Sequence, residues 1–211
     1  METHIFSKKE ELANAITHGI GAVLSIAMLV LLVTFSSFDG NVWTITASAV
    51  YGATMLLLFL SSTLVHSFPQ GKIKDLFEIF DHASIYLFIA GTYTPILLIA
   101  LGGKLGWTLF GIVWGAAVVG VVFKIFFVKK FVVLSTLIYV LMGWMIVIAW
   151  DALTASLAPG GIIFLVAGGL AYTVGALFYV WRGFTHHHMI WHLFVLAGAI
   201  LHFITVFFYI I

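Results

Sequence analysis

Seven long apolar runs follow one another along the chain, separated by short polar stretches. They cover residues 17–37, 41–66, 81–101, 105–123, 131–150, 162–181 and 188–211. Each approaches the roughly 20 residues that a helix needs to cross the hydrocarbon core of a bilayer. Turn signals such as PQGK at 69–72 and APGG at 158–161 lie between them. Because the runs lack the alternation of barrel strands, they predict an all-α membrane protein, a seven-transmembrane helix bundle.

Composition supports a membrane protein without a soluble extramembrane domain. Of the 211 residues, 63% are hydrophobic and 8% charged, whereas soluble domains are about a quarter charged. The N-terminus is polar for too long to be a cleavable signal peptide, so the first run should remain as a span. We therefore expect a single domain over residues 1–211, with residues 1–16 as a short cytoplasmic N-terminal segment.

The positive residues predict how the bundle is oriented. Only Lys104 falls on one side of the predicted spans, and the other side carries eight: Lys8, Lys9, Lys72, Lys74, Lys124, Lys129, Lys130 and Arg182. Lysine and arginine are retained on the cytoplasmic side of membrane proteins. The N-terminus is accordingly predicted in the cytoplasm and the C-terminus outside. A net charge of only +1 gives no reason to expect a nucleic-acid partner.

The stretch HHHMIWH, residues 186–192, opens the last span and suggests a metal site. In a helix, His188 and His192 stand four residues apart and share a face, as in helical zinc motifs. The alternating spans place His66 and Asp81 at the same cytoplasmic depth. With no cysteine in the chain, a metal must use histidine, carboxylate or water. We interpret His186 and His187 as loop residues at the headgroup level.

Three imidazoles with an open fourth position are typical of a catalytic zinc site. We therefore expect zinc bound by His66, His188 and His192, although imidazoles also accept manganese and iron. Asp81 could act as general base, and Ser62, four residues before His66, could orient water or stabilise an oxyanion. The alternatives are ordinary hydrogen-bonded histidines and a serine bonded back to its own helix.

Other polar residues in the spans have simpler explanations. Glu11, Asn14 and His18 share a helical face at the cytoplasmic rim, where capping or bonding to a neighbouring helix explains them as well as metal ligation does. His202 lies about 15 Å deeper than His192 along a helix, too far to bind the same metal. His82 is expected to point away from the face of Asp81.

Two features concern helix geometry alone. Pro95 should kink the third span because it removes one helical hydrogen bond. Small residues at Gly111 and Gly115, and again at Gly168 and Gly175, indicate close helix packing.

The chain resembles the hemolysin III family, the bacterial branch of the progestin and adipoQ receptor superfamily. Three motifs carry the resemblance: Glu11, Asn14, Thr17 and His18 in EELANAITH; Ser62, His66 and Asp81 in SSTLVHSF and FDHASIY; and His188 with His192 in HMIWH. The resemblance implies a seven-helix bundle in the plasma membrane of a bacterial cell, with zinc held by the three histidines and water near Asp81. Its relatives include adiponectin receptors and, more remotely, alkaline ceramidases.

From the residues and the resemblance together, we expect a zinc-dependent hydrolase of a lipid amide or ester at the cytoplasmic leaflet, with membrane lipid as its partner. Without a long N-terminal domain or sizeable outer loops, no protein hormone is expected as a partner. Two alternatives remain: a membrane-perturbing hemolysin with a structural zinc, and a non-catalytic regulator of membrane state. The sequence leaves the oligomeric state and the roles of Glu11, Asn14, His18 and His202 open.

Overall fold

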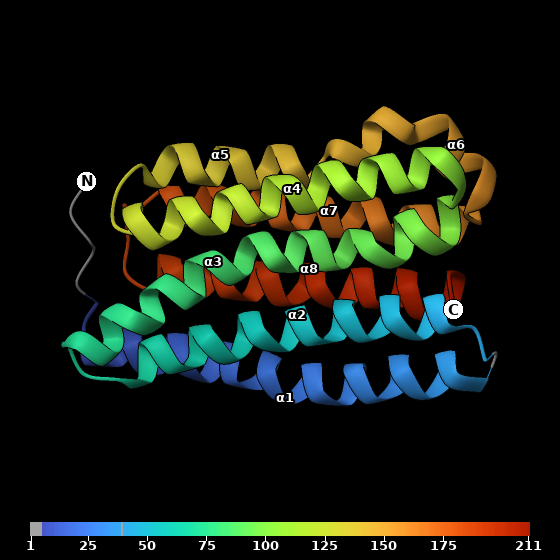
Figure 1. The fold of residues 1–211 in the computed structure, drawn as a ribbon. Coiled ribbons are helices and arrows are strands. Elements are labelled where there is room, and N and C mark those ends of the chain that lie inside the picture. The colour runs from blue at the N-terminus through green and yellow to red at the C-terminus, as the bar shows by residue number, and fades with distance from the viewer. Residues whose placement is uncertain (1–5, 39) are drawn as a thin grey trace.

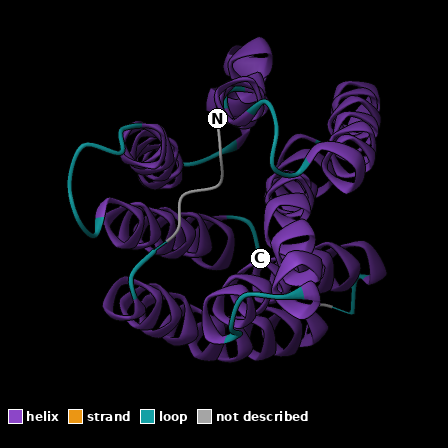
Figure 2. Ribbon diagram, turned by 90° about the vertical axis from the view of Figure 1, so that its left-hand side faces the viewer, coloured by secondary structure: helices purple, strands orange, loops and turns teal. Residues whose placement is uncertain are grey.

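The computed structural model describes residues 6–38 and 40–211, and these residues form helices joined by short turns, with no strand among them. Seven helical segments are long and apolar enough to cross a membrane, and they run side by side along a common axis (Figures 1 and 2). The elements are α1 (Lys8–Phe38), α2 (Val42–Ser67), α3 (Lys72–Pro95), the π-helix η1 (Ile96–Leu101), α4 (Gly103–Phe127), α5 (Val132–Gly143), the 3₁₀ helix η2 (Met145–Ala149), α6 (Trp150–Ser156), α7 (Pro159–Val180) and α8 (His187–Tyr209). The predicted seven-helix membrane bundle is confirmed.

The start of α1 and the C-terminus lie at opposite ends of the bundle (Figure 1). The end of the bundle where α1 begins also carries the α2–α3, α4–α5 and α7–α8 connections (Figure 1). We call this end of the bundle the polar end. Seven of the eight positive residues of that side lie in these connections or in the first three residues of α1 and α3, and Lys124 lies in the last turn of α4. That the polar end faces the cytoplasm stays a prediction.

Helices α1 and α3 each begin nine residues earlier than the apolar runs suggested, at Lys8 and Lys72. In the predicted N-terminal segment 1–16, residues 8–16 are therefore helical, and residues 1–5 lie outside the described part of the chain. Asp81, expected at the start of the third span, instead lies in the middle of a helix. Both extensions are amphipathic: their polar side chains bond to neighbouring elements, as the Glu11–Lys74 ion pair shows.

Two helices depart from α geometry within the bundle. After Pro95, the third span continues as the π-helix η1, and the kink expected at the proline stays a prediction. The fifth span breaks at Trp144, where α5 gives way to η2. The Tyr93 hydroxyl donates to Gly143 O at 2.8 Å and accepts from Ile146 N at 2.9 Å, so it satisfies backbone groups freed by the break.

Buried apolar side chains form two clusters, one shared by α3 to α7 and one shared by α1, α2, α3 and α8. The outer faces expose large apolar side chains, such as Val119 and Ile148, which suit contact with lipid tails. Gly168 allows close packing, because a Cβ there would meet the His202 ring. The same prediction was wrong for Gly111 and Gly115, where a Cβ would meet nothing within 4 Å.

Candidate metal centre

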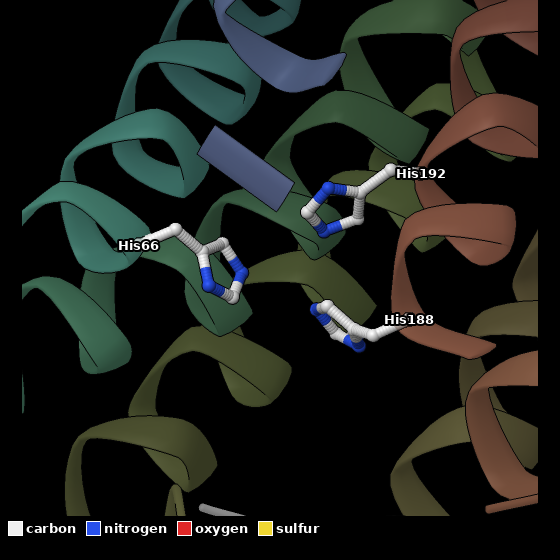
Figure 3. A group of neighbouring side chains, drawn as sticks. All are labelled: His66, His188 and His192. Carbon is white, nitrogen blue, oxygen red and sulfur yellow. The ribbon is translucent and has the colours of Figure 1, made fainter. Parts of the chain in front are cut away.

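Three histidines from two helices meet near the polar end of the bundle. Ligand nitrogens of His66, His188 and His192 all lie within 4.8 Å of one another, and Figure 3 shows the three rings turned toward a common centre. A tetrahedral zinc ion with Zn–N bonds of about 2.0–2.1 Å needs nitrogens roughly 3.4 Å apart. Modest ring rotations would therefore close the group around one ion.

The elements place these rings for simple reasons. His66 is in the last turn of α2, whereas His188 and His192 are in the first two turns of α8. The four-residue spacing puts the two α8 rings one above the other, 4.5 Å apart between centroids. Helix α1 packs against both α2 and α8 and so joins the two halves of the site.

His66 is oriented by a carboxylate. Its Nδ1 lies 2.6 Å from Glu11 Oε2, and the other oxygen of Glu11 accepts a hydrogen bond from Lys74 Nζ at 2.8 Å. With Nδ1–H donated to Glu11, the lone pair of His66 is on Nε2, which is buried and has no hydrogen-bond partner in the described structure. A carboxylate behind a histidine is the usual arrangement around metal ligands, so this orphaned nitrogen fits a metal.

His192 is held in a similar way by α1. Its Nδ1 lies 3.2 Å from the carbonyl oxygen of Asn14 and 3.2 Å from Thr17 Oγ1. The His18 ring stacks on it, with centroids 3.5 Å apart and planes 11° apart. When Nδ1–H of His192 is donated to the Asn14 carbonyl, the lone pair of His192 is on Nε2, which is then free to bind a metal. Glu11, Asn14 and His18 thus surround the histidines rather than join the ligand group.

Ser62 differs from its neighbours in sequence. Ser61 and Thr63 donate their hydroxyls to carbonyls four residues back, at 2.6 and 2.7 Å. The Ser62 hydroxyl is buried and has no hydrogen-bond partner within the described residues. The alternative that Ser62 merely bonds to its own helix is therefore not observed.

Asp81 shares its cavities with the three histidines but does not belong to the group whose ligand atoms converge. It lines the same cavity as Ser62 and His192, and it also lines a second, more polar cavity with His66 and Lys74. The prediction for His82 was wrong: its Nδ1 lies 3.5 Å from Asp81 Oδ2. The His82 ring is fixed by Glu78 O at 2.9 Å and the Tyr179 hydroxyl at 3.0 Å.

A long apolar cavity begins at this site and continues into the bundle. Its lining follows the third span from Asp81 to Ile96 and α8 from His188 to His202. Fifteen helical residues correspond to about 22 Å along the axis. Every helix except α4 contributes to the lining, which is predominantly hydrophobic and aromatic.

The polar cavity opens at the polar end of the bundle and is lined by both acidic and basic residues. The Phe6 ring lies against His66 and His188, with centroids 5.9 and 5.0 Å away, and so covers this side of the group. On the rim, Lys129 donates to Asp75 Oδ1 at 2.6 Å. This hydrogen bond, helped by the nearby Glu78 carboxylate, raises the pKa of Lys129.

His186 and His187 differ from one another. His186 caps α8 in the left-handed region, with φ of 64°, and its N–H donates to Glu10. His187 was predicted in a loop at the headgroup level, but it is buried, and its Nδ1 lies 3.2 Å from Phe178 O. His202 lies apart from the metal group, bonded to Leu165 O, as its depth predicted.

Comparisons with known proteins agree over nearly the whole chain. A family model described as Haemolysin-III related matches residues 6–203. The Hemolysin-3 homolog of Bacillus subtilis (strain 168) is 53% identical over 205 residues, covering 97% of this chain and 96% of the relative. Hemolysin-3 of Bacillus cereus is 52% identical over 203 residues, covering 96% and 93%. The human Monocyte to macrophage differentiation factor is 29% identical over 200 residues, covering 92% and 82%.

Proposed function

This chain belongs to the haemolysin-III related family of membrane proteins, and we propose that it is a zinc-dependent hydrolase cleaving an amide or ester bond of a membrane lipid at the cytoplasmic leaflet. The observation that carries the proposal is that His188 and His192 line one end of the long apolar cavity, while His66 converges on them from the polar cavity. A polar linkage at the histidines would then leave the acyl chain of the lipid inside the bundle.

The donor set fits zinc. His66, His188 and His192 offer three imidazoles, and Glu11 and the Asn14 carbonyl fix two of them with a nitrogen free for the ion. A bound zinc ion would supply Lewis-acid chemistry, polarising a carbonyl and lowering the pKa of water.

Asp81 and Ser62 supply the remaining groups. Asp81 accepts the proton of the water that adds to the carbonyl carbon, and passes it to the leaving amine or alcohol as the C–N or C–O bond breaks. Ser62, whose hydroxyl has no competing acceptor on its own helix, donates to the carbonyl oxygen as that oxygen gains charge. The cavity excludes bulk water from this chemistry because its lining is apolar.

The test is turnover of lipid amides and esters by the purified protein in detergent or liposomes. Asp81→Asn should retain metal and lose hydrolysis, by about 10²–10⁴-fold for a missing general base. Ser62→Ala should also lower turnover, and the matched control Ser61→Ala should not, since Ser61 bonds only to its own helix. Lipid hydrolysis that is equal in wild type and Asp81→Asn would contradict the proposal.

A second candidate function comes from the relatives. Two bacterial proteins more than half identical to this chain carry the name hemolysin, which favours a membrane-perturbing activity with a structural metal. In that case lysis of liposomes would persist in Asp81→Asn and no lipid product would accumulate. The hydrolase instead requires both product and its loss in that variant.

A further inference from the structure

We propose that the deep part of the apolar cavity contains a second, polar binding site, formed by Tyr172 and His202, which binds a hydroxyl group carried partway along the hydrocarbon chain of a lipid. This inference rests on the proposed function, because it requires a lipid chain in the cavity. It adds a substrate class: lipids with a mid-chain hydroxyl.

The first observation is a pair of orphaned polar atoms. The Tyr172 hydroxyl and Nδ1 of His202 are buried, and neither has a hydrogen-bond partner among the described residues. His202 as a whole is 8% exposed, and both residues line the cavity. Burying a polar atom without a partner is unfavourable, and in the interior of a membrane bundle no bulk water relieves it.

Several other polar side chains along the same cavity are hydrogen-bonded within the protein. The Tyr139 hydroxyl donates to His82 O at 3.0 Å, and Trp144 Nε1 donates to Thr173 Oγ1 at 2.9 Å. Thr92 and Thr136 bond to carbonyls of their own helices. Among the described lining residues below the histidine end, the buried side-chain polar atoms without a partner are thus those of Tyr172 and His202.

The geometry fixes the hydrogen-bonding character of the pair. His202 Nε2 lies 3.0 Å from Leu165 O, so Nε2 carries the proton and Nδ1 is an acceptor. Gly168 permits this contact, because any Cβ there would collide with the His202 ring. The Tyr172 and His202 rings meet edge to face, with centroids 5.2 Å apart. An acceptor beside a phenol complements an alcohol, which donates one hydrogen bond and accepts another.

The depth of Tyr172 and His202 in the cavity suits a substituent on the hydrocarbon chain of a lipid rather than its amide or ester linkage. His202 is ten residues beyond His192 on α8, about 15 Å along the helix. A lipid with its amide or ester at the histidines would pass Tyr172 and His202 well down its hydrocarbon chain. An unsubstituted chain would leave both polar atoms unpaired, which gives selectivity for the hydroxylated lipid.

The experiment compares binding of two fatty acids of equal length, one with a mid-chain hydroxyl and one without, to the full-length protein in detergent. Wild type should bind the hydroxylated acid roughly tenfold more tightly, the scale of one or two buried hydrogen bonds. Tyr172→Phe and His202→Phe should each abolish that preference while binding the plain acid as wild type does. Tyr51 is a buried tyrosine that does not line this cavity, so Tyr51→Phe is the matched control and should keep the preference for the hydroxylated acid.

Equal affinity of wild type for the two acids would overturn the polar site and leave the lipid-binding proposal standing. Failure of both acids to bind would overturn both. Because the comparison in wild type is decisive by itself, the result does not depend on the variants folding.

Discussion

Glu11 shows how one side chain can control the site from outside it. Its two carboxylate oxygens join His66 of α2 to Lys74 of α3, with both bonds shorter than 3 Å. The carboxylate fixes which nitrogen of His66 carries the proton and raises the basicity of the other. Glu11 is therefore a positioning residue.

We expect Glu11→Ala to weaken metal binding by about 10- to 100-fold, the usual effect of losing such a partner. Competition with a chromophoric chelator would measure the change. Asp75→Asn is the control: this carboxylate lies at the same end of the bundle and pairs with exposed Lys129, so affinity should stay as in wild type. Unchanged affinity in Glu11→Ala would contradict the positioning role.

For single residues, the sequence predicted which histidines converge but not which side chains surround them. Helical spacing and shared depth were enough to select His188, His192 and His66. A bond from Glu11 to a neighbouring helix was one of the expected explanations, but its partner His66 was not identified, because capping explains a polar residue near a helix start equally well. The burial of His187 was missed because a polar residue beside a loop carries no signal of the tertiary contact that covers it.

At the level of elements, the helices are longer and less regular than their apolar runs. The predicted starts of α1 and α3 were late because an amphipathic extension has the polarity of a loop until its polar face finds partners. The carbonyl oxygen of Gly143, freed at the break beside Trp144, is satisfied by Tyr93, a residue fifty positions before Gly143, so no local pattern could indicate the break. The prediction of close packing at glycines held for Gly168 and failed for Gly111 and Gly115 for the same reason, since contact depends on which helix lies opposite.

A pair of glycines tests this packing. At Gly52, a Cβ would lie 2.6 Å from Leu29 Cδ1 and 3.0 Å from Leu29 Cα, whereas at Gly111 it would meet nothing within 4 Å. Gly52→Ala should destabilise the bundle by about 1–3 kcal/mol through overpacking of α1 on α2. Gly111→Ala should be neutral or stabilising by up to about 1 kcal/mol, because alanine favours the helix.

Thermal unfolding of the two variants in one detergent would measure the difference. We expect a lower unfolding midpoint for Gly52→Ala than for Gly111→Ala. The reverse order would show that α1 and α2 do not approach as closely as described.

Across the whole molecule, the seven spans and the gathering of charge at one end followed from hydropathy and from the positions of lysine and arginine. The cavity could not be predicted in this way. Its lining combines side chains of nearly every helix, and only their packing decides whether space remains. The site lies where these two features meet: a polar end that holds histidines and an apolar interior able to hold a chain.

The orientation of the bundle has a direct test. We expect a fluorescent protein fused to the N-terminus to fluoresce in the cytoplasm, and a phosphatase fused to the C-terminus to be active only outside. The physical reason is the retention of the eight positive residues of the polar end on the cytoplasmic side. A C-terminal phosphatase without activity, beside a fluorescent C-terminal fusion, would place the histidines at the opposite leaflet.

Elemental analysis of the protein purified without chelators would show whether the three histidines bind one metal ion. We expect one zinc ion per chain in wild type, with loss of that zinc in His66→Ala and His188→Ala and its retention in His202→Phe. Wild-type protein without stoichiometric metal, or a His188→Ala variant that keeps its zinc, would show that the three histidines do not form a metal site.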